Sequence, residues 1–200
     1  MTRIIAGFAG SLTLAVPRSG TRPTSDRVRE AIFSALEARD VLEGACVFDL
    51  YAGSGALGLE AASRGAVDVV LVERAKPAAD VCRRNADAVL RAARGRRLRI
   101  RVVPRPVAAY LESAAAGVDV VFIDPPYDLA DGALSRDLEL LVPLLTPDAI
   151  VMVERSSRSP EPAWPDGITL DRRRDYGETT LWWASRTDEA DDADGGKSAD

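Results

Sequence analysis

Two hydrophobic patterns alternate along the middle of the chain, from about residue 45 to residue 154. Short apolar runs rich in β-branched residues are typical of buried strands, and longer stretches with apolar residues every three or four positions are typical of amphipathic helices. The short runs predict strands at 45–50, 68–73, 98–103, 118–123 and 149–154. The longer stretches predict helices at 56–64, 76–92, 106–115 and 133–142. This alternation favours a parallel sheet with helices on both faces.

The pattern changes near the carboxyl terminus. After Trp164 two more strands are predicted, at about 168–174 and 178–184, and the connecting Asp175-Tyr176-Gly177 leaves no room for a helix. Such strands form an antiparallel hairpin, which we place at the edge of the sheet. The expected fold class is therefore α/β: a Rossmann-like, mostly parallel seven-stranded sheet with a C-terminal antiparallel hairpin.

The amino-terminal part of the chain precedes this sheet. Apolar residues recur at helical spacing from Val28 to Leu36, and Thr24-Ser25-Asp26 supplies good capping side chains, so a helix should begin there. Residues 1–23 contain several glycines and prolines and predict a small β-hairpin and an arm outside the main fold. We therefore expect an N-terminal hairpin or arm at 1–25, a main domain at 26–187 and a disordered acidic tail at 188–200.

The composition excludes several kinds of chemistry. Histidine is absent, which removes the commonest general base and the commonest zinc ligand, and the two cysteines, Cys46 and Cys82, lack the spacing of a metal site. We expect reduced cysteines and no metal. No apolar run approaches the roughly 18 residues that span a bilayer, and the first residues lack a signal-peptide core, so we expect a cytoplasmic protein with no membrane partner.

Charge is unevenly distributed along the chain. The net charge is −5, but the predicted tail holds six acidic residues and only Lys197. Of 31 acidic and 26 basic residues, 25 of each remain when the tail is left out, so the rest of the chain is neutral. Residues 1–30 carry five arginines against Asp26 and Glu30, which concentrates basic charge at one end.

A glycine loop follows the first predicted strand of the sheet. Gly53, Gly55 and Gly58 spell G-x-G-x-x-G, and Glu73 ends the next strand at the spacing of a ribose-binding acid, so a nicotinamide-dependent oxidoreductase has to be considered. Asp49 argues against it, because a carboxylate at this point would repel a pyrophosphate. S-adenosylmethionine has no phosphate, and its ammonium and sulfonium groups would be attracted by an acid.

The predicted cofactor is therefore S-adenosylmethionine. The glycines would let the backbone approach its amino-acid part, and Glu73 would accept hydrogen bonds from the ribose hydroxyls. The alternative is that the glycines only permit a tight turn and that Glu73 only ends a strand. The predicted cofactor-binding residues are Asp49, Tyr51, Ala52, Gly53, Ser54, Gly55, Gly58 and Glu73.

A second motif follows the fourth predicted strand, which runs directly into Asp124-Pro125-Pro126-Tyr127. Residues that leave the carboxyl end of a central strand face the ligand crevice of such a sheet. Asp124 and the carbonyl of Pro125 could accept both N–H groups of an exocyclic amine, the prolines would stiffen the loop, and Tyr127 could stack on a base. We predict these four residues to be catalytic; a merely rigid turn is the structural alternative.

These motifs, together with the amino-terminal sequence, resemble the RsmD family of 16S ribosomal RNA guanine-N2 methyltransferases. The resemblance runs from about Arg3 to Trp183 and is most specific in Arg22-Pro23-Thr24-Ser25-Asp26-Arg27-Val28-Arg29-Glu30-Ala31-Ile32-Phe33. It implies a class I methyltransferase fold, one guanine N2 of the small subunit as target, and an assembled particle as the partner. The segment Val103-Pro104-Arg105-Pro106 departs from the polar residue that such folds often place near adenine, so no adenine contact is predicted.

Candidate RNA-binding residues come from both ends of the chain. The predicted turn at Asp175-Tyr176-Gly177 follows a strand parallel to the others, so it should emerge at the same edge as the active site. The dense basic run from Arg91 to Arg101 enters the sheet at the opposite edge and is interpreted as solvated surface. The candidates are Arg18, Arg22, Arg27, Arg29, Arg172, Arg173, Arg174 and Tyr176.

Three other functions remain open at this point. A DNA or protein amino methyltransferase could use the same tetrapeptide, and an NAD-dependent oxidoreductase could use the glycine loop. A noncatalytic RNA-binding module would not require the cofactor acids and the tetrapeptide together.

Overall fold

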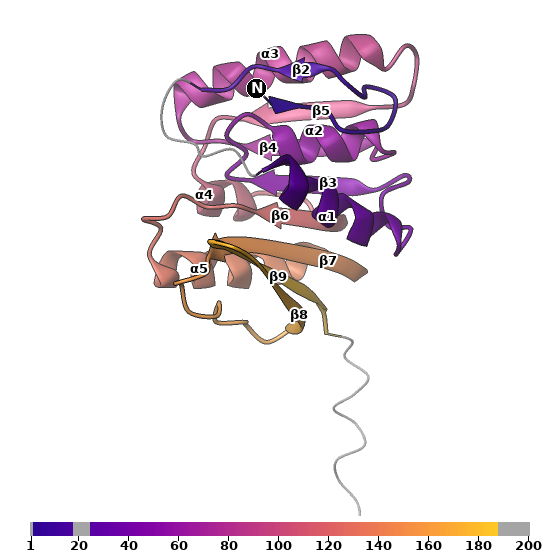
Figure 1. The fold of residues 1–200 in the computed structure, drawn as a ribbon. Helices are drawn as coiled ribbons and strands as arrows, with labels where there is room; N and C mark the ends of the chain where they lie inside the picture. The colour runs from indigo at the N-terminus through magenta and orange to yellow at the C-terminus, as the bar shows by residue number, and fades with distance from the viewer. Residues whose placement is uncertain (1, 18–24, 188–200) are drawn as a thin grey trace, which may run out of the picture.

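A seven-stranded sheet forms the centre of the molecule in the computed structural model, which describes residues 2–17 and 25–187. The strand order is β5-β4-β3-β6-β7-β9-β8 (Figure 1). The predicted tail at 188–200 and two of the candidate RNA-binding residues, Arg18 and Arg22, lie outside the described residues.

The predicted mostly parallel sheet with a C-terminal antiparallel hairpin is confirmed. The parallel strands are β3 (Cys46–Leu50), β4 (Asp68–Val72), β5 (Arg99–Val103), β6 (Val118–Ile123) and β7 (Leu145–Ser156). The hairpin consists of β8 (Ile168–Tyr176) and β9 (Thr179–Arg186), and β9 pairs antiparallel with both β7 and β8. Because Ser156 pairs with Thr179, the hairpin turn lies at the carboxyl edge of the parallel strands, as predicted.

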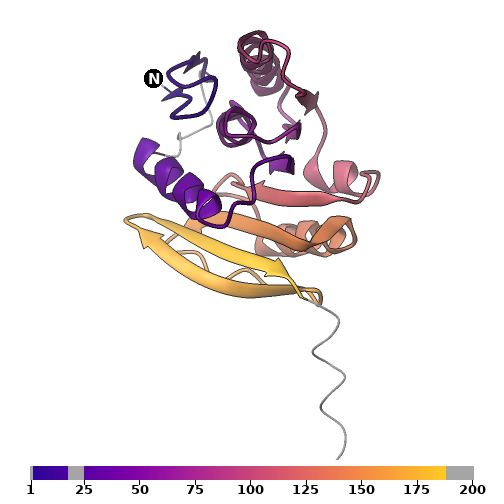
Figure 2. The same ribbon diagram turned by 90° about the vertical axis from the view of Figure 1, so that its right-hand side faces the viewer.

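Helices cover both faces of the sheet (Figure 2). One face packs against α1 (Asp26–Glu37), α2 (Ala56–Ser63) and α3 (Lys76–Ala92). The other packs against α4 (Val107–Leu111), α5 (Asp131–Leu141) and the 3-10 turn η1 (Val142–Leu144). Among the described residues, no helix is both long and apolar enough to cross a bilayer.

Two predicted boundaries differ from the structure for local reasons. The helix expected at 106–115 is only five residues long, since the backbone amides of Ser113 and Ala114 bond to carbonyls three residues earlier, and the α-helical pattern ends there. The strand expected at 149–154 begins earlier, since Leu145 already pairs with Val118 before a register shift.

The amino-terminal hairpin is part of the packed fold, so the prediction that it lies outside the main fold is wrong. Its strands β1 (Thr2–Arg3) and β2 (Thr13–Leu14) pair with each other, and Ile4 and Leu14 are fully buried in the core beside α2. The Glu60 carboxylate of α2 accepts hydrogen bonds from the backbone amides of Ile5 (2.6 Å) and Ala6 (3.0 Å).

A single asparagine links the hairpin to the glycine loop. Asn85 of α3 accepts a hydrogen bond from the Ala15 amide and donates to the Ala15 carbonyl, both at 2.9 Å. The same amide group donates to the Ser54 carbonyl at 2.8 Å. The segment after β2 is thereby held against the edge of the sheet where the predicted cofactor loop lies.

Candidate active site

The glycine loop between β3 and α2 has backbone conformations that explain its sequence. Gly53 and Gly55 have φ angles of 56° and 80°, in the left-handed region that glycine adopts at least cost, and Gly55 is the N-cap of α2. Gly58 has a different role: a Cβ there would lie 2.4 Å from a Leu71 methyl and 3.1 Å from Cβ of Asp49. The absence of a side chain at Gly58 therefore lets α2 pack directly on the sheet.

Asp49 lies beneath this loop and is almost completely buried, with 2% of its surface exposed. Its carboxylate accepts a hydrogen bond from the Gly58 amide at 2.8 Å. Burial, together with the nearby Asp124 and Glu73 carboxylates, raises the pKa of Asp49 to about 7, although the Gly58 amide opposes the shift. A cationic ligand beside Asp49 would favour its ionised form.

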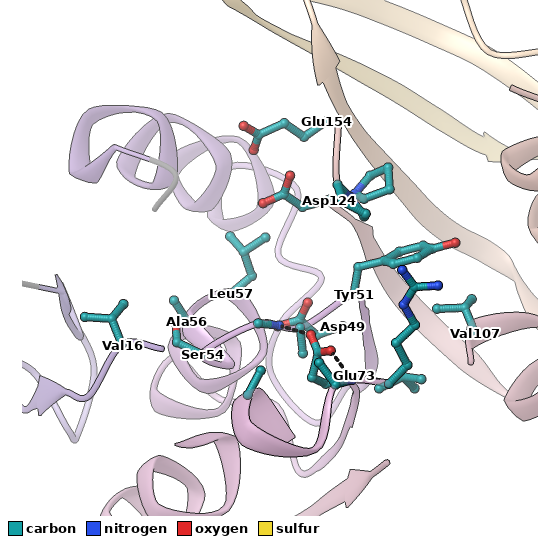
Figure 3. A pocket seen from close by; sticks show the side chains of 18 of the residues that line it. Val16, Asp49, Tyr51, Ser54, Ala56, Leu57, Glu73, Val107, Asp124 and Glu154 are labelled. Carbon is teal, nitrogen blue, oxygen red and sulfur yellow. Dashed lines mark hydrogen bonds between the residues drawn. The ribbon is translucent and has the colours of Figure 1, made fainter. Parts of the chain in front are cut away.

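Glu73 is fixed at the end of β4 by two backbone amides. One carboxylate oxygen accepts from the Gly53 amide at 3.0 Å and the other from the Ala75 amide at 2.7 Å, as the dashed lines in Figure 3 show. Each oxygen retains a further lone pair that can accept from a ligand. This is the arrangement that a ribose diol requires, and it also joins Glu73 to the glycine loop.

Tyr51 is held in an unusual backbone conformation at the start of the loop. Its φ angle is 66°, uncommon for an aromatic residue, and its hydroxyl donates a hydrogen bond to the Asp137 carboxylate of α5. Burial is the largest cause that raises the pKa of both groups. The pair therefore fixes the loop from the side opposite to Asp49.

The Asp124-Pro125-Pro126-Tyr127 tetrapeptide follows β6 directly. In the sheet, Ile123 pairs with Leu50 of β3 and with Val153 of β7, so Asp124 leaves the sheet between these two strands. Tyr127 is 65% exposed, which leaves its ring accessible to a partner. In Figure 3 the side chain of Asp124 extends over Leu57, and the Asp49 and Glu73 side chains lie nearer the glycine loop.

One cavity of about 500 Å³ brings the two motifs together, and its size is typical of a small-molecule site. The predicted residues that line it are Asp49, Tyr51, Ala52, Gly53, Ser54, Glu73, Asp124, Pro125, Pro126 and Tyr127. Gly55 and Gly58 are not among the residues that line the cavity; both have a structural role, in the turn and in helix packing, and their predicted contact with the cofactor stays a prediction.

The family to which the chain belongs follows from comparison with known sequences. The family model described as Conserved hypothetical protein 95 matches residues 2–185. The chain belongs to this family. It is 35% identical over 179 residues to ribosomal RNA small subunit methyltransferase D of Escherichia coli, with 88% of this chain and 85% of that protein covered. The family resemblance based on the sequence motifs is thus confirmed.

Other relatives have similar names and the same fold. The putative rRNA methyltransferase YlbH of Bacillus subtilis is 30% identical, covering 88% of this chain and 95% of that protein. The structure of the putative methyltransferase yhhF from Escherichia coli has a TM-score of 0.79 at 30% identity, covering 94% and 99% of the two chains. Magnesium protoporphyrin IX methyltransferase from Synechocystis with bound SAM shares the fold, with a TM-score of 0.63 at 15% identity over 80% of this chain and 79% of that one.

Several lining residues of this family member were not predicted from its sequence. Glu154, at the carboxyl end of β7, is 8% exposed and lies beside Asp124. Arg105, in the segment for which no adenine contact was predicted, and Val107, the first residue of α4, also line the cavity. The only available signal was their position after a strand, since any side chain at the carboxyl end of a parallel strand is a candidate.

Arg29 is corrected from an RNA contact to a structural residue. It is 1% exposed; its guanidinium donates to the Arg3 carbonyl at 2.9 Å and to the Asp26 carboxylate at 2.6 Å, and it lies 4.0 Å from Glu60. Arg29 borders the cavity, but its guanidinium is occupied by these partners and almost no part of it reaches the molecular surface where an RNA phosphate would lie. Its spacing from Ile32 and Leu36 could have indicated this, because it falls on the apolar face of α1.

The remaining described RNA candidates lie on α1 and the C-terminal hairpin. Arg27 is exposed in the first turn of α1, and Arg174 is exposed on β8. Arg173 is exposed and pairs with Asp175, whereas Arg172 is partly buried over the ring of Trp183. Tyr176 packs partly into the core at the turn. Figure 2 shows the amino end of α1 and the hairpin turn on the same side of the molecule.

Proposed function

We propose that this protein transfers a methyl group from S-adenosylmethionine to the exocyclic N2 of a guanine in 16S ribosomal RNA, within an assembled small ribosomal subunit. The observation that carries the proposal is the single cavity that joins the glycine loop and its acids to the Asp124-Pro125-Pro126-Tyr127 tetrapeptide. Membership of a family with relatives named ribosomal RNA small subunit methyltransferase D gives the class of nucleic acid.

The residues around the glycine loop fit S-adenosylmethionine. Asp49 offers a buried carboxylate to a ligand with two cationic groups, and Glu73 offers fixed acceptors to a ribose. Gly53 presents backbone to the cavity without a side chain in the way. The Synechocystis methyltransferase with bound SAM has the same fold.

The main task of the protein is to hold the methyl donor and the acceptor amine in the orientation for transfer. S-adenosylmethionine supplies an electrophilic methyl group on a positively charged sulfur. The amino nitrogen forms the new bond with its lone pair, while the carbon–sulfur bond breaks and leaves its electrons on sulfur, which becomes neutral. The extra proton on nitrogen passes to Asp124 or to water. Asp124 and the Pro125 carbonyl would hold the two amino N–H groups, and no metal ion or histidine is required.

The RNA would reach the cavity across the side on which α1 and the C-terminal hairpin meet. Arg27 and Arg174 are exposed there and can contact phosphates, and Tyr127 can stack on the flipped base. Arg173 is exposed on the same hairpin, but its guanidinium lies over Trp182 on the opposite face of the sheet, and it stays a proposed contact. Arg18, Arg22, Arg172 and Tyr176 remain proposed contacts on the basis of the sequence. Because Arg27 and Arg174 lie outside the cavity, they would hold the RNA phosphates away from the carboxylates inside it, which would repel them.

The alternative functions are disfavoured by specific features. A dinucleotide would bring its pyrophosphate close to Asp49, whose carboxylate would repel it. An amino methyltransferase for DNA or protein could use the same cavity, so only the substrate distinguishes it from the proposed function.

The experiment compares substrates for label incorporation from methyl-labelled S-adenosylmethionine. Undermodified small subunits, protein-free 16S RNA, duplex DNA and ribosomal proteins are offered separately, and NADH binding is measured by calorimetry. We expect incorporation into the RNA of the small subunits and no NADH binding. Incorporation into DNA or protein alone, or NADH binding without methyl transfer, would contradict the proposal.

A further inference from the structure

Asp124 and Glu154 are neighbours on adjacent strand ends. Ile123 of β6 pairs with Val153 of β7, so the next residue of each strand is Asp124 and Glu154 respectively. Side chains alternate between the faces of a sheet, and the residues two positions earlier, Phe122 and Met152, both belong to the core on the α1–α2 face. The two carboxylates therefore project on that same face.

The two carboxylates line the same part of the cavity as Tyr127. Both line the main cavity, and both line a small adjoining pocket with Tyr127. Figure 3 shows the two side chains side by side, on the Leu57 side of the sheet. Glu154 is 8% exposed, so a base that enters the cavity would meet a carboxylate largely shielded from bulk water.

Guanine offers a specific pattern of donors to two adjacent carboxylates. Beside its exocyclic amine, guanine carries a ring N1–H, so its edge presents neighbouring donors. Adenine and cytosine carry a ring acceptor beside their exocyclic amine. A second carboxylate next to the one that binds the amine would thus attract guanine and repel the lone pair of the other two bases.

We propose that Glu154 is the residue that determines base specificity: it accepts a hydrogen bond from N1–H of the target guanine while Asp124 accepts from the N2 amine. The inference rests on the proposed function and names the group that selects the base. Neighbouring strands lie about 4.8 Å apart, and the extra methylene of glutamate lets the two carboxylates converge on one base edge.

The test uses a base that keeps the amine and lacks the ring donor. 2-Aminopurine has the 2-amino group of guanine, but its N1 is an acceptor. Small subunits are reconstituted with 16S RNA that carries guanine or 2-aminopurine at the methylated position, and kcat/KM is measured for both. We expect wild-type protein to prefer guanine by about 10- to 100-fold.

Glu154→Gln should reduce this preference at least about 10-fold, because the amide can donate to N1 of 2-aminopurine and binds N1–H of guanine less strongly. Affinity for S-adenosylmethionine should stay within a few-fold by calorimetry. The matched control is Glu139→Gln, at an exposed position of α5, which should leave the preference unchanged.

The ratio of kcat/KM for guanine to kcat/KM for 2-aminopurine distinguishes a role of Glu154 in base specificity from a structural role. If Glu154→Gln lowers both kcat/KM values equally, Glu154 supports the site without facing N1, and the inference is overturned while methylation of guanine by the wild type still stands. If the wild type transfers no methyl group to the subunits that carry guanine, the proposed function itself has failed. A melting temperature measured for each variant shows that the compared proteins are folded.

Discussion

At the scale of single residues, the buried carboxylate of Asp49 makes stability depend on pH. Its pKa is raised to about 7 in the folded protein, from an ordinary value of 3.8. Between these values the folded state binds a proton that the unfolded chain does not, so this contribution to stability is present in acid and is lost as the pH rises through about 7.

Replacing Asp49 should therefore weaken the dependence of stability on pH. Asp49→Asn removes the titrating group, so the ligand-free variant should lose less stability than the wild type between about pH 5 and about pH 8. Urea denaturation at the two pH values measures the difference. An equal change in both proteins would show that Asp49 titrates as an exposed aspartate does.

Asp124 should affect turnover and not donor affinity. Asp124→Ala removes the acceptor proposed for the amine, and turnover should nearly vanish, while the affinity for S-adenosylmethionine stays within a few-fold because the glycine loop and Glu73 are unchanged. Single-turnover transfer to small subunits and calorimetry measure the two quantities. Near-normal transfer would remove Asp124 from the mechanism.

Glu73 should show the complementary behaviour. Glu73→Gln keeps a side-chain oxygen that can accept from the Gly53 or Ala75 amide, so the loop should remain in place while the charge is lost. A charge-assisted hydrogen bond is worth about 1.5–3 kcal/mol, so affinity for S-adenosylmethionine should fall about 10- to 100-fold. Unchanged affinity in calorimetry would leave Glu73 with only its structural hydrogen bonds.

Single residues were predictable where they belong to a motif. Asp49, Glu73 and Asp124 could be placed in one site because each ends a strand at a recognised spacing. Glu154 could not, since a lone acid after an apolar run has no spacing to recognise, and its place beside Asp124 depends on β7 lying next to β6. The prediction for Arg29 was wrong because it considered only the charge of the side chain and not its position on the buried face of α1.

At the scale of elements, the strands of the sheet were easier to predict than the amino-terminal hairpin. Buried parallel strands are apolar throughout, so their runs are visible in the sequence. The hairpin packs through contacts with residues more than fifty positions away, chiefly Glu60 and Asn85, and no local pattern encodes such contacts.

The position of the hairpin leads to a prediction about truncation. Deleting residues 1–16 would uncover α2 and remove the amides that Glu60 binds, so stability should fall on the order of several kcal/mol, with a lower melting temperature. The matched control is Arg3→Ala, which removes an exposed side chain but keeps the carbonyl that Arg29 binds. Equal melting temperatures for the truncated and full-length proteins would contradict this account.

At the scale of the whole molecule, the strand order gathers four acids at one edge. Asp49, Glu73, Asp124 and Glu154 come from β3, β4, β6 and β7, which are far apart in the sequence and adjacent in the sheet. A cationic methyl donor and a base that presents hydrogen-bond donors both suit these four acids, and the phosphates of a polyanion suit the exposed arginines outside the cavity.

The most direct measurement identifies the nucleoside that the protein makes. Undermodified small subunits are incubated with methyl-labelled S-adenosylmethionine and the protein, the 16S RNA is digested, and the labelled nucleoside is identified by chromatography and mass spectrometry. If the proposed function is correct, the wild-type protein yields N2-methylguanosine at one position and Asp124→Ala yields none. Labelled N6-methyladenosine or N4-methylcytidine in its place would contradict the account.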